Sequence, residues 1–380
     1  MLSNPLTRRM EDCLADLERQ SQLRELRMDT GVNFTSNDYL GLAGDARLKA
    51  ALLEGIEECK RIGSTGSRLL SGHDAAWDEL EDEFAAFAGS ESSLFFASGF
   101  AANTGLLSAL LGKDDLVFSD ALNHASIIDG IRLSGAEKII YPHLDLDSLE
   151  QALRAHQDHP GARLIVTESI FSMDGDRAPL PEIFQLASRY GAELIVDEAH
   201  ATGVCGPEGR GLMAELGLQP LAIVHTCGKA LASMGAFVCG SRTLREFLIN
   251  RARTFIFSTA VPAYIAKQIR AALTLAASME AERRYLTSLA ASLKRKLLQV
   301  GFSCGSSTSH IVPVILGKNA EALSFATALN EQGFAVRAIR PPTVPEGTAR
   351  VRLSLTAALN SSHIERLTDA MASISVLRHV

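Results

Sequence analysis

A single lysine, Lys229, lies in a run of small and apolar residues, HTCGKALASMGAF, from His225 to Phe237. An ammonium group is costly to remove from water unless it is paired or neutralised, so a lysine in such a run is usually retained for its amine. An acidic residue, Asp197, ends the apolar segment ELIVDEAH, and 229 − 197 = 32 residues separate it from the lysine.

The lysine and the carboxylate together suit an aldehyde cofactor such as pyridoxal phosphate. This cofactor forms a Schiff base with a lysine, and it needs an acid on its ring nitrogen to act as an electron sink. The alternative is ordinary: Asp197, Glu198 and His200 follow a strand, and polar residues there often satisfy loop amides.

Three further polar segments fit the same chemistry, each with a structural alternative. A glycine turn opens a helix at Ser98 in SGFAANTGLLSALL, where backbone amides would hold a phosphate or Ser98 would simply cap the helix. His124 in NHASIIDG would stack on a flat cofactor or hydrogen-bond within its loop. TESIFSMDGD offers Glu168, Ser172 and Asp174, or an ordinary turn at Gly175.

Other chemistries lack their motifs. The letters DEAH suggest a helicase, but no G-x-x-x-x-G-K-[ST] phosphate loop is present, and G-x-S-x-G, H-E-x-x-H and G-x-G-x-x-G are absent too. The six cysteines are scattered without a C-x-x-C pair, so we expect no disulfide framework and no metal site, and a cytoplasmic location.

Composition favours small metabolites as partners. The net charge of −7 over 380 residues argues against a nucleic-acid or membrane-binding surface, because both need clustered Lys and Arg. The first 20 residues have no apolar core and predict an amphipathic helix, not a signal peptide. The apolar segment from Leu221 carries Lys229, which excludes a membrane span.

The elements that must position these residues alternate along the chain. Apolar runs at 93–98, 115–120, 138–142, 163–169, 193–199, 222–227 and 235–241 predict strands buried on both faces, and helical segments separate them. This alternation of strands and helices predicts an α/β fold with a mostly parallel sheet covered by helices. Ligands bind beyond the carboxyl ends of such strands. A long helical pattern then runs from Pro262 to about Val300. Strands HIVPVIL, FAVRAI and ARVRLSL with two helices predict a small α+β domain.

Motifs over nearly the whole chain resemble the α-oxoamine synthases, which are pyridoxal-phosphate enzymes of the aspartate-aminotransferase fold (fold type I). The motifs are SNDYLGL, GSTGSRLLSG, SGFAAN, NHAS, TESIFSMDGD, VDEAHATGV, GKA, FSTAVP and IRPPTVPEGTARVRLSLTAA. The resemblance implies a seven-stranded sheet and three parts: an N-terminal helix and arm at 1–36, a large cofactor-binding domain at 37–275 and a small C-terminal domain at 276–380.

The resemblance also implies a role for each matching residue. Lys229 would form the Schiff base, Asp197 would pair with the ring nitrogen, His200 would donate to the ring hydroxyl and His124 would stack on the ring. Gly99, Phe100, Thr226 and Ser172 would contact the cofactor, and Thr259 would reach the phosphate of the other subunit of a homodimer. Arg352, assisted by Asn37, would bind the amino-acid carboxylate, and Thr343 and Arg24 would contact the acyl substrate. Arg24 fits a solvated helix face equally well.

The expected reaction is a decarboxylative condensation of L-alanine with a pimeloyl thioester, on coenzyme A or an acyl carrier protein, giving 8-amino-7-oxononanoate, CO2 and a free thiol. Three alternatives stay open: a glycine- or serine-using synthase such as glycine C-acetyltransferase, an aminotransferase, and a non-catalytic subunit of the same fold. One methyl group is worth only about 1–3 kcal/mol of discrimination, so sequence does not separate the first of these.

Overall fold

The computed structural model describes residues 4–376, which fold into two compact units. Asp38–Ser172 and Arg177–Arg284 form the larger unit. The smaller unit contains the chain up to Asn37, Met173–Asp176 and the chain from Tyr285 onward. The domain boundaries expected from the sequence stay a prediction.

A seven-stranded sheet forms the centre of the larger unit, with the strand order β2-β8-β7-β6-β5-β3-β4. Its strands are β2 (Ser92–Phe96), β3 (Leu116–Asp120), β4 (Glu137–Tyr141), β5 (Arg163–Glu168), β6 (Glu193–Asp197), β7 (Ala222–Thr226) and β8 (Ala236–Gly240). Strand β8 runs antiparallel to both of its neighbours, β2 and β7, and the other pairs of the sheet are parallel. The expectation of a mostly parallel seven-stranded α/β sheet is therefore confirmed.

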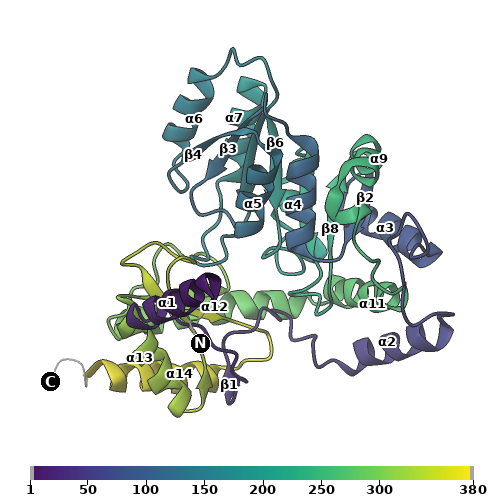
Figure 1. Ribbon diagram of the computed structural model, residues 1–380. Coiled ribbons are helices and arrows are strands. Elements are labelled where there is room, and N and C mark those ends of the chain that lie inside the picture. Colours follow the sequence, from purple (N-terminus) through teal and green to yellow (C-terminus); the bar gives the residue numbers. More distant parts are fainter. Residues whose placement is uncertain (1–3, 377–380) are drawn as a thin grey trace. The chain divides into compact units, whose positions relative to one another are not determined.

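Helices cover both faces of this sheet (Figure 1). On one face lie α4 (Gly99–Leu110), α5 (Ala125–Ser134), α9 (Arg242–Arg251) and α10 (Arg253–Ile256), whose apolar side chains share a core with those of the strands. On the other lie α3 (Ala75–Ala88), α6 (Leu146–Ala155) and α7 (Leu180–Tyr190). The unit also contains α2 (Ala46–Glu58), 3₁₀ helix η1 (Pro207–Gly209), α8 (Leu212–Leu216) and α11 (Tyr264–Ser278).

Aromatic side chains fill the second face near β2 and β8. Trp77 of α3 stacks on Phe95 with ring centroids 4.2 Å apart, and Phe84 stacks on Phe237 at 3.9 Å. Leu94 and Phe96 point to the opposite core. This alternation fixes the register of β2, because a slip of one residue would exchange the two faces.

The edge strand β4 differs from the expectation of strands buried on both faces. Only Tyr141 of this strand is buried. Edge position alone is not the reason, because β2 at the opposite edge is almost wholly buried. Helices α3, α4 and α9 pack on β2, whereas α6 packs on β4.

The smaller unit is built on an antiparallel sheet of order β11-β12-β9, formed by β9 (Ile311–Gly317), β11 (Ala338–Ile339) and β12 (Ala349–Ser354). Strand β1 (Val32–Asn33) pairs in parallel with β10 (Phe334–Ala335). The single strand expected at FAVRAI is thus two short strands that belong to different sheets. Helices α13 (Asn319–Glu331) and α14 (Ser361–Val376) complete the unit.

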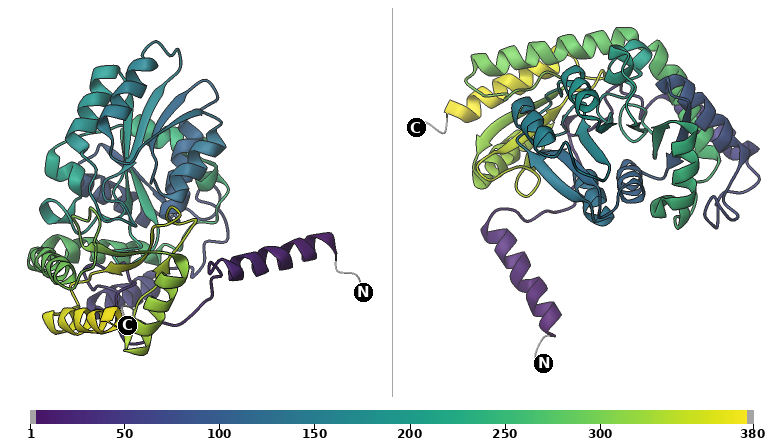
Figure 2. Two further views of the ribbon diagram at one scale, coloured as in Figure 1. Left: turned by 90° about the vertical axis from the view of Figure 1, so that its left-hand side faces the viewer. Right: turned by 90° about the horizontal axis from the view of Figure 1, so that it is seen from above.

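Both helical segments predicted at the N-terminus and after Pro262 form in the structure. The long helical pattern after Pro262 is interrupted at Met279, so α11 ends at Ser278 and α12 covers Glu280–Gln299. The amphipathic N-terminal helix forms as α1 (Pro5–Arg19), which has no buried residue and projects from the rest of the smaller unit (Figure 2).

Candidate active site

The polar residues singled out in the middle of the chain gather at the carboxyl edge of the large sheet. Glu168 ends β5, Asp197 ends β6, Thr226 ends β7, and Lys229 follows three residues later. Strands β5, β6 and β7 are parallel neighbours, so their ends meet at one edge. This is where α/β sheets bind ligands.

Asp197 is a buried carboxylate with two donors. The Asn103 Nδ2 amide donates to its Oδ2 at 2.6 Å, and the backbone N–H of Ala199 donates to its Oδ1 at 2.8 Å. Hydrogen bonds to the charged form favour that form. The two donors therefore hold the Asp197 carboxylate in one orientation.

The same Asn103 amide reaches towards His124. Its Nδ2 also donates to Ser126 Oγ at 2.9 Å, and Ser126 Oγ lies 2.8 Å from His124 Nδ1. The Ser126 backbone N–H donates to Nδ1 as well, at 3.2 Å. Since both Ser126 groups use the Nδ1 lone pair, the proton of neutral His124 belongs on Nε2.

The environment of His124 keeps this ring neutral. Burial lowers the pKa of His124; the Asp197 carboxylate opposes that shift and Lys229 adds to it. One side of the ring remains exposed to solvent, and Phe100 meets it edge-on with the ring centroids 6.5 Å apart. A neutral, partly exposed imidazole is suited to stacking on a flat ligand.

Lys229 sits on a tight, hydrogen-bonded loop between β7 and β8. The N–H of Ala232 donates to the Lys229 carbonyl at 2.9 Å, and the N–H of Ser233 donates to the Cys227 carbonyl at 2.9 Å. The loop closes through Ala232, whose φ of 47° is left-handed. The lysine is half-buried, in contrast to the fully buried strand before it.

Next to this loop, the first turn of α4 forms a cradle for an anion. Ser98 caps the helix by accepting from the N–H of Ala101 at 3.1 Å, and the free amides of a first helical turn attract negative charge. Thr226 Oγ accepts from the N–H of Gly228 at 3.3 Å. A Cβ added at Gly99 would lie 3.6 Å from that same Thr226 Oγ, so glycine leaves the space open.

His200 is buried and has a defined partner. The Tyr39 hydroxyl lies 2.6 Å from its Nδ1, and both side chains are almost fully buried. Of the other residues expected near the cofactor, Ser172 is half-buried beyond β5, and Thr259 is exposed.

Four predicted substrate residues lie in the smaller unit and form two pairs. Arg352 Nη2 of β12 donates to Asn37 Oδ1 at 3.1 Å, and Arg352 is only 9% exposed. Arg24 Nη2 donates to Thr343 Oγ1 at 3.2 Å. Each pair joins residues more than 300 positions apart, as the two hydrogen bonds span 315 and 319 residues.

Sequence reasoning missed three residues that organise the site: Asn103, Ser126 and Tyr39. Asn103 lies in the predicted helix opening, and the hydrophobic pattern of α4 gives no sign that this polar residue faces inward. Ser126 lies two residues after His124, which is close enough in sequence for a local hydrogen bond between the two.

The donor set fits pyridoxal phosphate. A buried carboxylate suits its ring nitrogen, an amine suits its aldehyde, a neutral imidazole suits its ring face, and helix amides with a threonine suit its phosphate. The fold and this set of residues define a fold type I pyridoxal-phosphate enzyme.

Residues 29–371 match the family model described as aminotransferase class I and II. The chain belongs to this family and, within it, to the α-oxoamine synthases. An 8-amino-7-oxononanoate synthase from Anaeromyxobacter dehalogenans is 47% identical over 345 residues, which cover 90% of this chain and 86% of that protein.

Solved structures agree with this membership. A structure of SPT (serine palmitoyltransferase) with PLP gives a TM-score of 0.90 at 28% identity, covering 98% of this chain and 99% of that one. The crystal structure of 8-amino-7-oxononanoate synthase from Francisella tularensis gives a TM-score of 0.79 at 29% identity, covering 92% of this chain and 99% of that one.

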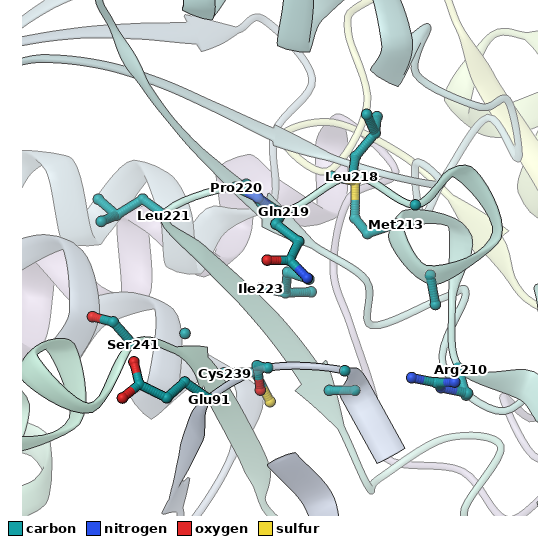
Figure 3. Close-up of a pocket in the computed structure, with 16 residues that line it drawn as sticks. Glu91, Arg210, Met213, Leu218, Gln219, Pro220, Leu221, Ile223, Cys239 and Ser241 are labelled. Atoms are coloured by element: carbon teal, nitrogen blue, oxygen red, sulfur yellow. The ribbon is translucent and has the colours of Figure 1, made fainter. Parts of the chain in front are cut away.

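A separate cavity of about 440 Å³ opens at the amino-terminal end of β7, the far end of that strand from Thr226 (Figure 3). The polar residues that line it are Ser90, Glu91, Arg210, Gln219 and Ser241, which come from four different segments. None of the predicted site residues lines it.

Residues 4–376 contain neither a candidate membrane helix nor a candidate metal cluster. No helix there combines the length and apolar character that a bilayer crossing requires. No three or more His, Cys, Asp or Glu side chains gather there in a way that would hold a metal ion.

Proposed function

We propose that this protein catalyses the decarboxylative condensation of L-alanine with a pimeloyl thioester, releasing 8-amino-7-oxononanoate, CO2 and the free thiol. The observation that carries the proposal is the buried Asp197 carboxylate, held by Asn103 near Lys229 and His124 at the sheet edge. The names of relatives that are 44–47% identical over most of the chain support the choice of substrates.

In this function Lys229 Nζ would hold the cofactor and, once released from it, would move protons. It removes the Cα proton of alanine and later returns a proton to the same carbon after CO2 has left. Bound pyridoxal phosphate supplies the electron sink that makes this proton acidic. A general base acts best when its proton affinity matches the working pH, and the half-buried Lys229 amine lies at the sheet edge where the other proposed site residues gather.

The remaining residues would hold and orient the cofactor. Asp197 keeps a proton on the ring nitrogen, with Asn103 fixing the direction of its Oδ2. If Tyr39 donates its hydroxyl proton to His200 Nδ1, the His200 proton lies on Nε2, from which it can donate to the ring hydroxyl. The first turn of α4 and Thr226 bind the phosphate.

Arg352 binds the carboxylate of alanine. Its guanidinium is a planar fork that matches a carboxylate, and Asn37 holds one arm of that fork through the 3.1 Å hydrogen bond. Thr343 and Arg24, which hydrogen-bond to each other, contact the acyl substrate.

A substrate comparison tests the reaction. The enzyme with added pyridoxal phosphate is given L-alanine with pimeloyl-CoA, and thiol release and CO2 are measured together. We expect one CO2 for each thiol, and none of either from Lys229→Ala. Faster turnover of glycine with acetyl-CoA would contradict this assignment and favour a glycine C-acetyltransferase. Reaction of 2-oxo acids without CO2 would favour an aminotransferase.

A homodimer in the cytoplasm completes the proposal. Thr259 is exposed in the single chain, as expected of a residue that serves a partner's phosphate site, and this supports the homodimer. The six cysteines are free thiols, which supports the cytoplasmic location. Mixing inactive Lys229→Ala with weakly active Thr259→Val tests the shared site. Sharing predicts that mixed dimers carry one intact site, so activity rises on mixing; additive activities would contradict it.

A further inference from the structure

A second buried carboxyl group, Glu168, lies beside Asp197. The two residues end neighbouring parallel strands and are paired in register, so their side chains leave the sheet on the same side. Glu168 is 3% exposed and Asp197 is 6% exposed. Two carboxylates this close and this poorly hydrated do not both ionise near neutral pH, because like charges repel and neither is solvated.

The hydrogen-bond donors decide which of the two is charged. Asp197 receives Asn103 Nδ2 on one oxygen and the Ala199 N–H on the other. Glu168 receives the backbone N–H of His124, but its Oε1 has no hydrogen-bond partner within residues 4–376. A buried carboxylate oxygen with no donor is expensive, whereas the neutral acid is much less so.

The charges that face Glu168 from the surrounding elements favour the neutral acid as well. Burial is the main cause that raises the pKa of Glu168 well above its usual range, and Asp197 of β6 and Asp120 of β3 raise it further. Lys229 and the His124 N–H act in the opposite direction. His124 itself adds no positive charge, because its own pKa is lowered by burial.

We propose that Glu168 is a positioning residue that stays a neutral carboxylic acid in the working enzyme, so that Asp197 carries the only negative charge of this carboxyl pair. The inference deepens the proposed function and rests on it for the role of Asp197. The neutral form matters for Lys229: an anionic Glu168 would stabilise the ammonium form of that side chain, so that less free amine would be present to accept a proton.

Infrared difference spectroscopy reads the proton directly. Spectra of wild type and Glu168→Gln are compared at pH 7, with and without pyridoxal phosphate. We expect the variant to lose a band of a protonated carboxyl group and no carboxylate band. Loss of carboxylate bands alone would overturn the proposal.

Glu198 provides the matched control, since it is also fully buried and burial raises its pKa to about 8. Glu198→Gln should remove a different protonated-carboxyl band and leave the Glu168 band in place. If Glu168→Gln fails to fold, the Glu198→Gln protein still decides the matter. A protonated-carboxyl band that persists in it at pH 7 supports the proposal, and its absence overturns it.

Catalysis gives a second readout that a merely structural role would not change. Glu168→Gln keeps the neutral shape, so we expect kcat and cofactor affinity within about threefold of wild type at pH 7. The alkaline limb of its kcat profile should move to higher pH, because no proton can leave position 168. A cofactor affinity reduced more than about tenfold at pH 7 would show that a charge was needed there.

The two proposals can fail separately. The infrared measurement uses no substrate, so it stands even if the enzyme prefers another amino acid or thioester. Conversely, turnover of alanine and pimeloyl-CoA can be confirmed while the proton on Glu168 is refuted.

Discussion

The amide of Asn103 is the most informative single group to remove. It donates to Asp197 Oδ2 at 2.6 Å and to Ser126 Oγ at 2.9 Å, and the side chain is 2% exposed. Asn103→Leu keeps the branched shape of the side chain and deletes both donors, which leaves one oxygen of the buried Asp197 carboxylate without this partner.

The expected losses of stability and of kcat follow from those two hydrogen bonds. A hydrogen bond to a charged group is worth about 1.5–3 kcal/mol and a neutral one about 1 kcal/mol, so the free energy of unfolding should fall by about 2–4 kcal/mol. A carboxylate released from its donor also shifts in position, and a misplacement of about 1 Å costs roughly 100-fold in rate. We therefore expect kcat to fall by about 10- to 100-fold.

Two assays and two companion variants separate catalysis from folding. Denaturant unfolding gives the stability, and thiol release from pimeloyl-CoA gives kcat. Ser126→Ala removes the neutral bond alone, so it should lose about 1 kcal/mol and keep kcat within about threefold. Asn103→Asp adds a like charge beside Asp197 and should recover part of its activity as the pH is lowered.

One combination of stability and activity in Asn103→Leu would refute this catalytic role of the amide. If Asn103→Leu loses stability as expected but keeps kcat within about twofold of wild type, the amide only packs α4 against the sheet. The orientation of Asp197 would then depend on the Ala199 N–H and the strand end.

Three further outcomes test other parts of the structure. Ala232 has a φ of 47°, a conformation that costs an L-residue about 1 kcal/mol or more, so Ala232→Gly should raise the free energy of unfolding by about that amount, with a higher Tm as the check. The folded-state pKa of Glu198 is about 8 against an unfolded value of 4.5, so its contribution to stability is complete below pH 4.5 and is lost as the pH rises towards 8. Wild type should lose about 3 kcal/mol through this group between pH 4.5 and 7, and Glu198→Gln should flatten that slope in denaturant titrations; an unchanged slope would contradict the assignment. In the smaller unit, Arg350 Nη1 is 2.5 Å from Asp174 Oδ1 and 3.2 Å from the Met173 carbonyl, so Arg350→Met should cost about 3 kcal/mol of unfolding free energy, whereas exposed Arg189→Met, the control, should cost under about 1 kcal/mol.

The sequence by itself determined the architecture and the choice of candidate site residues. Apolar strands that alternate with helical segments require a covered parallel sheet, and parallel strands bring their ends to one edge, so Asp197, Thr226 and Lys229 had to lie near one another. The family motifs added the cofactor and the substrate pairs. Local patterns carry this information because each strand, turn and helix is specified by residues close together in the chain.

Only the tertiary structure decided how those groups are held and charged. Asn103 contacts Asp197 across 94 positions and Tyr39 contacts His200 across 161, and no periodicity in the chain relates such residues. The proposed proton on Glu168 depends on the register of β5 with β6 and on burial, both of which arise from packing. Hydrogen bonding and desolvation depend on distances in space, so they set the state of the site only after the chain has folded.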